Sequence, residues 1–183
     1  MGTRNLTAVF MDGEYRVAQY GQWDGYPSGQ GLTILDFLKN TTKLSFKERL
    51  KGVRFLTQED FKDIDRKYGQ DWVKIYPHLS RDVGGKILQA IMNGASALKN
   101  SIDFAGDSLF CEYAYVIDLD KNTFEVYEGF NKEPLTESER FYDAKKDDSD
   151  YSPVKLIHTF DLDRLPVEKE FLEILEPDED EDE

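Results

Sequence analysis

The residues best suited to chemistry gather in one short stretch, QYGQWDGYPSGQG, which occupies positions 19–31 before an apolar segment. Backbone N–H groups of a glycine-rich loop can hold a phosphate where a helix begins, because the helix dipole and unpaired donors both face the anion. A carboxylate beside an indole can serve as a base, since burial raises its pKa. Trp, Tyr and Gln together are also typical of a binding surface, or of a turn that is only structural.

A phosphate site would rest on Gly25, Gly29 and Gly31, which lie between a predicted strand and a predicted helix start. Their spacing matches neither the dinucleotide-binding pattern G-x-G-x-x-G nor the P-loop pattern G-x-x-x-x-G-K-[ST]. The strand before them is also predicted to pair as a hairpin and not as half of a βαβ unit. The pattern therefore favours a turn or a binding surface over a nucleotide-phosphate site.

A catalytic site would use Asp24 as its base, buried beside the indole of Trp23. Arg4 and one of the glutamines of the stretch could then orient an amide or a carboxylate. The stretch supplies no second acid and no nucleophile close to Asp24. We assign no catalytic residue, and whether the chain is an enzyme stays open.

A structural or partner-binding loop explains the same residues. Asp24-Gly25 and Pro27-Ser28-Gly29 are common turn sequences, and Trp23 and Tyr26 could pin the loop to the core. Exposed Trp and Tyr also suit an interface. The candidate residues for binding a ligand or partner are Arg4, Gln19, Gln22, Trp23, Asp24, Gly25, Tyr26, Gly29, Gln30 and Gly31.

Elsewhere the chain offers little nucleophile or metal chemistry. Cys111 and His158 could form a nucleophile–base pair if their strands are neighbours, although a cysteine is more commonly a small buried side chain. Residues 118–122 (DLDKN) resemble the first half of a calcium loop, but Thr123 and Gly129 stand where glycine and a bidentate glutamate are required. The sequence lacks three His or Cys ligands at zinc spacing. We predict no metal and no cofactor.

The formal net charge of −14 is unevenly distributed. Residues 1–100 contain 15 Lys and Arg against 11 Asp and Glu, whereas residues 101–183 contain 8 against 26. The second part therefore repels the phosphates of nucleic acid and attracts basic protein surfaces. Solubility alone is the other explanation of this charge. The two parts could also pair between chains, so the charge allows a homo-oligomer.

The sequence shows neither a signal peptide nor an apolar run as long as a membrane span. Cys111 is the only cysteine, which excludes an internal disulfide. These features predict a cytoplasmic protein without a membrane partner.

A hairpin must position the stretch. Residues 5–10 and 15–20 alternate like strands, and Asp12-Gly13 between them is a strong signal for a two-residue turn. This register would place Arg4 at the mouth of the stretch. The facing pairs that it predicts are Phe10–Tyr15, Ala8–Val17, Leu6–Gln19 and Arg4–Gly21.

The rest of the chain reads as helices followed by strands. Helical spacing and capping residues predict helices over about 32–40, 45–52, 58–67, 72–76 and 83–93. A last helix should begin at Pro166 and turn Phe171, Leu172, Ile174 and Leu175 inward. β-branched and aromatic residues predict strands over 111–119, 123–128 and 154–160.

These elements predict one α+β domain over residues 1–175, in which antiparallel hairpins from both ends form a sheet and the middle helices pack on one face. Residues 131–152 show little periodicity and are interpreted as a mobile surface loop. The acidic residues 176–183 are predicted to be a disordered tail.

Four segments, MGTRNLT, VAQYGQWDGYPSGQG, LSRDVGGKIL and CEYAYVIDLDKNTFEVYEGF, resemble a family of uncharacterised proteins in bacteriophages, prophages and some cellular genomes. The shared feature is a GTR start followed by a W-D-G-Y-P-x-G loop. The resemblance covers most of the chain except 131–152 and the tail. It implies a phage setting and a host-directed or accessory role, and it transfers no catalytic residue.

Two functional hypotheses follow. The first is a non-enzymatic acidic interaction protein, phage-encoded, whose acidic part and Trp23–Gly31 loop engage a host protein with a basic surface. The second is a small-molecule, nucleotide-like binding protein or enzyme with its site at the hairpin–helix junction around residues 19–31.

Overall fold

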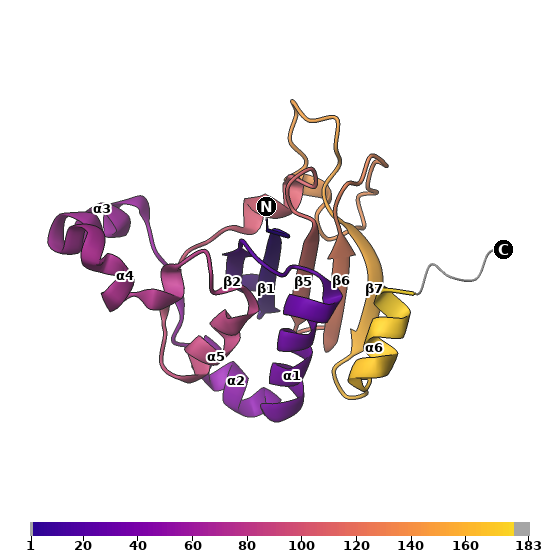
Figure 1. Cartoon of the computed structure of the whole chain (residues 1–183), viewed down its shortest axis with the longest axis horizontal. Coiled ribbons are helices and arrows are strands. Elements are labelled where there is room, and N and C mark those ends of the chain that lie inside the picture. Colours follow the sequence, from indigo (N-terminus) through magenta and orange to yellow (C-terminus); the bar gives the residue numbers. More distant parts are fainter. Residues whose placement is uncertain (1, 178–183) are drawn as a thin grey trace.

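The computed structural model describes residues 2–177 and confirms the α+β class, with a five-stranded mixed sheet and helices from the middle of the chain (Figure 1). The strand order is β2-β1-β5-β6-β7, in which β1 runs parallel to β5 and the other pairs are antiparallel. Most of the predicted acidic tail lies outside the described residues. The strands are β1 (Asn5–Met11), β2 (Glu14–Gly21), β5 (Tyr113–Asp118), β6 (Thr123–Glu128) and β7 (Lys155–Asp161).

The register of the first hairpin differs from the predicted one. Phe10 faces Tyr15, as the two-residue turn requires. A bulge at Arg16 then shifts the pairing by one residue, because two residues of β2 oppose one of β1. Beyond the bulge the facing pairs are Val9–Val17, Ala8–Ala18, Thr7–Gln19, Leu6–Tyr20 and Asn5–Gly21.

This shift corrects the predicted position of Arg4. A one-residue slip moves every side chain to the other face of the sheet, so Asn5 and not Arg4 lies opposite Gly21. The guanidinium of Arg4 instead lies over the ring of Phe110, 4.6 Å from its centroid.

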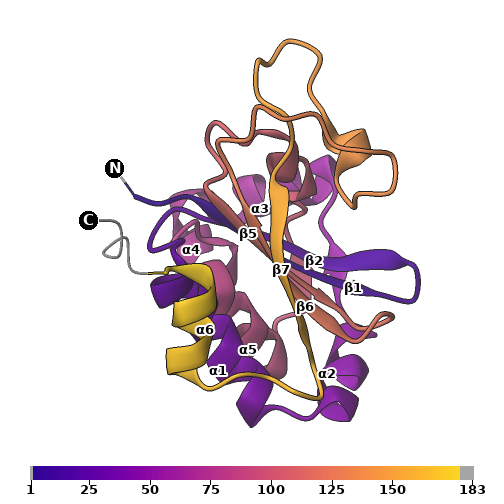
Figure 2. The ribbon, with the colours of Figure 1, turned by 90° about the vertical axis from the view of Figure 1, so that its right-hand side faces the viewer.

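One face of the sheet is covered by four helices (Figure 2). Phe124 of β6 stacks on Phe171 of the last helix, with ring centroids 6.0 Å apart. That helix begins at Glu168 and not at Pro166, and Ile174, which was expected to point inward, is exposed. The four helices are α1 (Leu32–Asn40), α2 (Lys43–Leu50), α5 (Ile87–Met92) and α6 (Glu168–Leu175).

The opposite face is covered by two irregular segments. Residues 102–106 and part of 131–154 pack against apolar side chains of the central strands. Phe141 is buried and its ring contacts that of Tyr127, 5.0 Å away. Asn131 closes the base of the second segment, because its amide donates to the carbonyl of Pro153 at 3.0 Å. The central strands are therefore buried on both sides.

A cluster of charges ties residues 131–152 to the sheet. Arg140 lies between Asp118 and Glu125, and the three side chains are 11, 1 and 9 % exposed. Its Nε donates to Glu125 at 2.8 Å, and it also donates to Asp118. Burial lowers the pKa of Arg140, but the hydrogen bonds to Glu125 and Asp118 outweigh burial and raise it. Mobility of residues 131–152 stays a prediction. A motion that carried Arg140 away from the sheet would have to break this ion cluster.

Residues 56–81 form an arm that projects from the sheet (Figure 1). It is closed by the short parallel pair β3 (Arg54–Phe55) and β4 (Ala97–Leu98) and contains α3 (Gln58–Tyr68) and α4 (Trp72–Ile75). The predicted capping box opens α3, where Thr57 and Asp60 exchange hydrogen bonds. No residue of the arm is fully buried.

None of the helices in residues 2–177 combines the length and the apolarity that crossing a membrane requires.

Arg140→Ala should lower the free energy of unfolding by about 3–5 kcal/mol, because two buried carboxylates lose their counter-charge. Lys155→Ala removes an exposed ion pair with Glu133 at the edge of the same segment and should leave the urea midpoint nearly unchanged. Urea unfolding followed by circular dichroism measures both. Similar losses in the two variants would contradict a structural role for the buried cluster.

Candidate functional site

An open groove of about 710 Å³ lies beside the stretch 19–31. Its walls come from the loop after β2, from the start of α1 and from the segment before α5. A volume of this order is typical of ligand sites. The lining residues are Trp23, Asp24, Tyr26, Ser28, Gly29, Gln30, Leu32, Thr33, Asp82 and Lys86.

Two aromatic side chains of the groove are open to solvent. Trp23 is 44 % and Tyr26 is 50 % exposed. The indole Nε1 of Trp23 donates to Asp82 at 2.7 Å, and the ring of Tyr26 lies 6.1 Å from that of Tyr113. Both rings are therefore held in place while they present apolar surface to the solvent.

Three carboxylates lie close enough to Tyr113, the neighbour of Tyr26, to affect its pKa. The pKa of Tyr113 is raised to about 12, first by burial and then by Glu128, Glu176 and Glu112, whose charges disfavour the phenolate. Glu176 follows α6 and also accepts a hydrogen bond from the hydroxyl of Ser28 at 3.3 Å. Through Ser28, Glu176 adds a carboxylate from a distant segment of the chain to one edge of the groove.

The backbone N–H groups at the start of α1 are already used. Within the turn Pro27–Gly31, Gly29 and Gly31 donate to the carbonyl of Tyr26 at 2.9 and 3.3 Å, and Gln30 donates to that of Asp24 at 2.8 Å. The N–H of Ser28 faces Glu176 at 3.4 Å. These four donors are not free for a phosphate, so the geometry weakens the phosphate interpretation.

Two of the predicted glycines serve close backbone contacts. A Cβ on Gly29 would lie 2.2 Å from the carbonyl oxygen of Asp24, and one on Gly25 would lie 2.6 Å from that of Thr3. The hydroxyl of Tyr115 also donates to the carbonyl of Gly25 at 2.7 Å. These glycines shape the turn, and their roles need no ligand.

The carbonyl of Trp23 is clamped by two side-chain amides. Asn5 and Gln30 each donate to it at 3.1 Å. The other side of the Gln30 amide accepts from the N–H of Gly85 at 2.7 Å. Gln30 therefore positions the loop, and Asn5 is a positioning residue that the sequence analysis missed. A polar residue at the start of an apolar strand was the available signal.

Five predicted site residues do not line the groove, namely the glycines Gly25 and Gly31 and the three side chains of Arg4, Gln19 and Gln22. Arg4 lies over Phe110 as described above. The side chain of Gln19 is buried and donates to the carbonyl of Ser80 at 3.5 Å. The side-chain oxygen of Gln22 accepts from the hydroxyl of Tyr20 at 2.6 Å. None of the three is placed to orient a ligand at Asp24.

The catalytic interpretation of Asp24 lacks its required neighbours. Asp24 is exposed, so it does not have the burial that would turn it into a base. Of the hydroxyl groups in the lining, Ser28 is bonded to Glu176 and Thr33 donates to the carbonyl of Gly29 at 3.3 Å. Both of these hydroxyl groups are therefore already engaged in hydrogen bonds.

The alternative pair Cys111–His158 is not formed. Strand β6 lies between β5, which follows Cys111, and β7, which carries His158. Burial raises the pKa of the Cys111 thiol, as do Asp107 and Glu112. Asp118 accepts hydrogen bonds from two N–H groups of its own turn. Among residues 2–177, no group of three or more His, Cys, Asp or Glu is arranged to hold a metal ion.

Comparisons of this chain with models of protein families, with curated proteins and with solved structures find no match. Its function is therefore argued from the groove itself. The resemblance to a phage family stays a prediction.

Gly29→Ala should destabilise the protein by about 1–3 kcal/mol, because the new methyl group meets a backbone oxygen that cannot move without shifting the loop. Gly52→Ala is the matched control, since its Cβ would have its nearest neighbour at 3.6 Å. Thermal unfolding should show a fall of roughly 2–4 °C per kcal/mol for the first variant. Equal midpoints in the two variants would contradict the close contact at Gly29.

Cys111 should not react with a thiol reagent such as 5,5′-dithiobis(2-nitrobenzoate) in the native protein at about pH 8, because the thiolate is the reactive form and burial disfavours it. In guanidinium chloride the same thiol should react at once. The absorbance of the released thiolate measures both. Rapid labelling of the folded chain would show that Cys111 is accessible and reopen its use as a nucleophile.

Proposed function

We propose that this chain is a non-enzymatic interaction protein that binds a basic protein surface at the groove beside Trp23 and Tyr26. The observation that carries the proposal is the exposure of these two rings on a groove edged by Asp24, Asp82 and Glu176. Aromatic faces attract ammonium and guanidinium groups, and carboxylates form charge-assisted hydrogen bonds with them. A lysine or arginine side chain can contact both the aromatic rings and the carboxylates of the groove.

The charge of the whole chain favours the same kind of partner. A formal net charge of −14 steers basic molecules toward the surface before any close contact forms. Of the residues that line the groove, only Lys86 is cationic. Lys86 limits how many positive groups the groove can accept at once, which favours one inserted side chain over a run of them.

The resemblance to phage and prophage proteins adds a finer proposal, that the partner is a host protein. The runner-up function is a small-molecule site in the same groove, which its volume of about 710 Å³ would allow. The occupied N–H groups of the turn disfavour a phosphate-bearing ligand there. A second copy of the chain stays a further candidate partner.

The test uses tryptophan as a local reporter. Trp23 and Trp72 are the only two tryptophans, so Trp72→Phe leaves Trp23 to report on the groove. Titration with nona-arginine should change its fluorescence saturably, more weakly as salt rises. Asp24→Asn should weaken binding about five- to tenfold. Asparagine tolerates the positive φ of 54° at this position.

Asp36→Asn is the matched control, because it removes an equally charged, exposed carboxylate of α1 that does not line the groove. It should weaken nona-arginine binding less than about twofold. Equal losses in both variants would mean that binding follows net charge alone, and the groove proposal would fail. In native mass spectrometry, a small bound mass lost on Trp23→Ala would favour the small-molecule function instead.

A further inference from the structure

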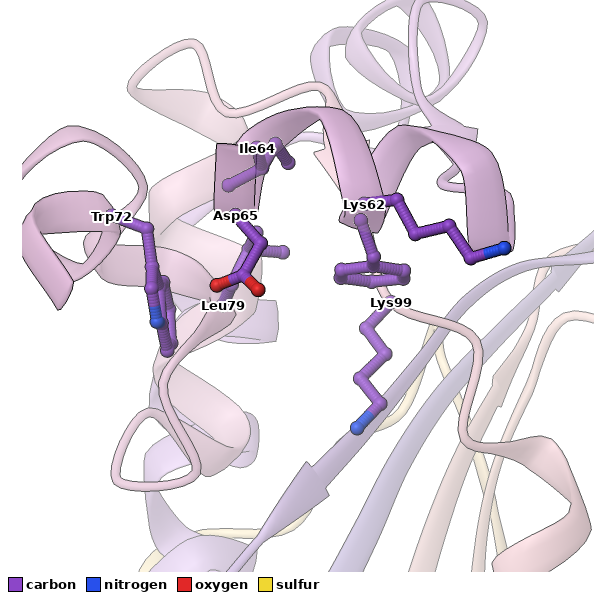
Figure 3. A pocket seen from close by; sticks show the side chains of 7 residues that line it. Lys62, Ile64, Asp65, Trp72, Leu79 and Lys99 are labelled. Carbon is purple, nitrogen blue, oxygen red and sulfur yellow. The ribbon is translucent and has the colours of Figure 1, made fainter. Parts of the chain in front are cut away.

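The arm contains a second cavity, of about 410 Å³, that is separate from the groove (Figure 3). Its walls come from α3, from α4, from the turn that follows α4 and from the residue after β4. Phe61, Ile64, Trp72 and Leu79 are its apolar lining, and Lys62, Asp65 and Lys99 are its charged lining.

This apolar lining is only half-buried. The arm contains two aromatic and two aliphatic side chains in one cavity, yet it has no fully buried residue of its own. A concave, mostly apolar surface of this volume with few polar groups is the usual form of a small-molecule site. The cavity is therefore large enough for a ring or a short alkyl chain.

The charges of α3 indicate which sign the ligand carries. Of the four acids of α3, Asp65 is the one without an ion pair or side-chain hydrogen bond among the described residues. In Figure 3 its carboxylate points into the opening between Trp72 and Lys99, while the ammonium groups of Lys62 and Lys99 point away from it. The other three acids are paired, as Glu59–Lys62, Asp60–Arg54 and Asp63–Arg66.

We propose that this cavity binds an organic cation, namely an apolar ring or short chain that carries one ammonium or guanidinium group. The apolar part packs on Phe61 and Leu79, and the positive group lies between the indole of Trp72 and the carboxylate of Asp65. An anion would have to use Lys62, which is paired with Glu59 at 3.5 Å, or Lys99, whose ammonium group points away from the opening in Figure 3. The proposal uses none of the groove residues and is independent of the function proposed above.

The experiment uses the full chain with Trp23→Phe, which leaves Trp72 as its only tryptophan. The probe is benzyltrimethylammonium, titrated at constant ionic strength, with benzoate and benzyl alcohol as anionic and neutral comparisons. We expect saturable quenching of Trp72 by the cation, and binding of the other two compounds at least about fivefold weaker.

Asp65→Asn should weaken binding of the cation about five- to tenfold. Asp63→Asn is the matched control, because Asp63 has the same charge on the same helix, is paired with Arg66 at 2.6 Å and does not line this cavity. Its effect should stay below about twofold.

Absence of saturable quenching, equal binding of benzoate, or equal losses in the two aspartate variants would each overturn the proposal. The comparison of the three probes uses the chain in which Asp63 and Asp65 are both present. It therefore tests the proposal even if one of the aspartate variants folds poorly. The readout at Trp72 also separates this proposal from the groove, which Trp23 reports. Failure at one site leaves the result at the other unaffected.

Discussion

The parallel pairing of β1 with β5 is the contact on which the rest of the structure depends. It joins the N-terminal hairpin to the three C-terminal strands, and it places both β1 and β5 in the interior of the sheet. A parallel pair needs a long crossover, and the helical middle of the chain supplies it. Because both faces of β1 and β5 are covered, their sequences NLTAVFM and YAYVID read as largely apolar runs and not as strict alternation.

The same pairing sets the geometry of the candidate site. Asn5 of β1 and Tyr115 of β5 reach the loop from neighbouring strands and hold the carbonyl groups of Trp23 and Gly25. Gln30 adds a bond to the segment before α5, which carries Asp82 and Lys86 to the other wall. The exposed aromatic rings are therefore presented by a preorganised loop, which lowers the entropy lost when a partner binds.

The sequence predicted the features that depend on neighbouring residues. The turn at Asp12-Gly13, the capping box at Thr57 and the helix over 32–40 follow from local chemistry, and the structure confirms them. The bulge at Arg16 and the burial of Arg140 depend on contacts across the sheet, for which the sequence has no local signal. Half of the predicted site residues line the groove, and Asp82 was missed because only the folded chain brings it to Trp23.

Net charge and local geometry play different roles in the two proposed sites. The field of an acidic chain attracts cations to every acidic surface, and salt screens it over about 8–10 Å. It cannot by itself distinguish Asp24 from Asp36, or Asp65 from Asp63. An aromatic face beside an uncompensated carboxylate can make that distinction, because the contact removes water from the cation and adds attraction that salt screens less. In both proposals the aromatic face of a tryptophan therefore distinguishes one acidic site from another, and the net charge of the chain attracts cations to its surface.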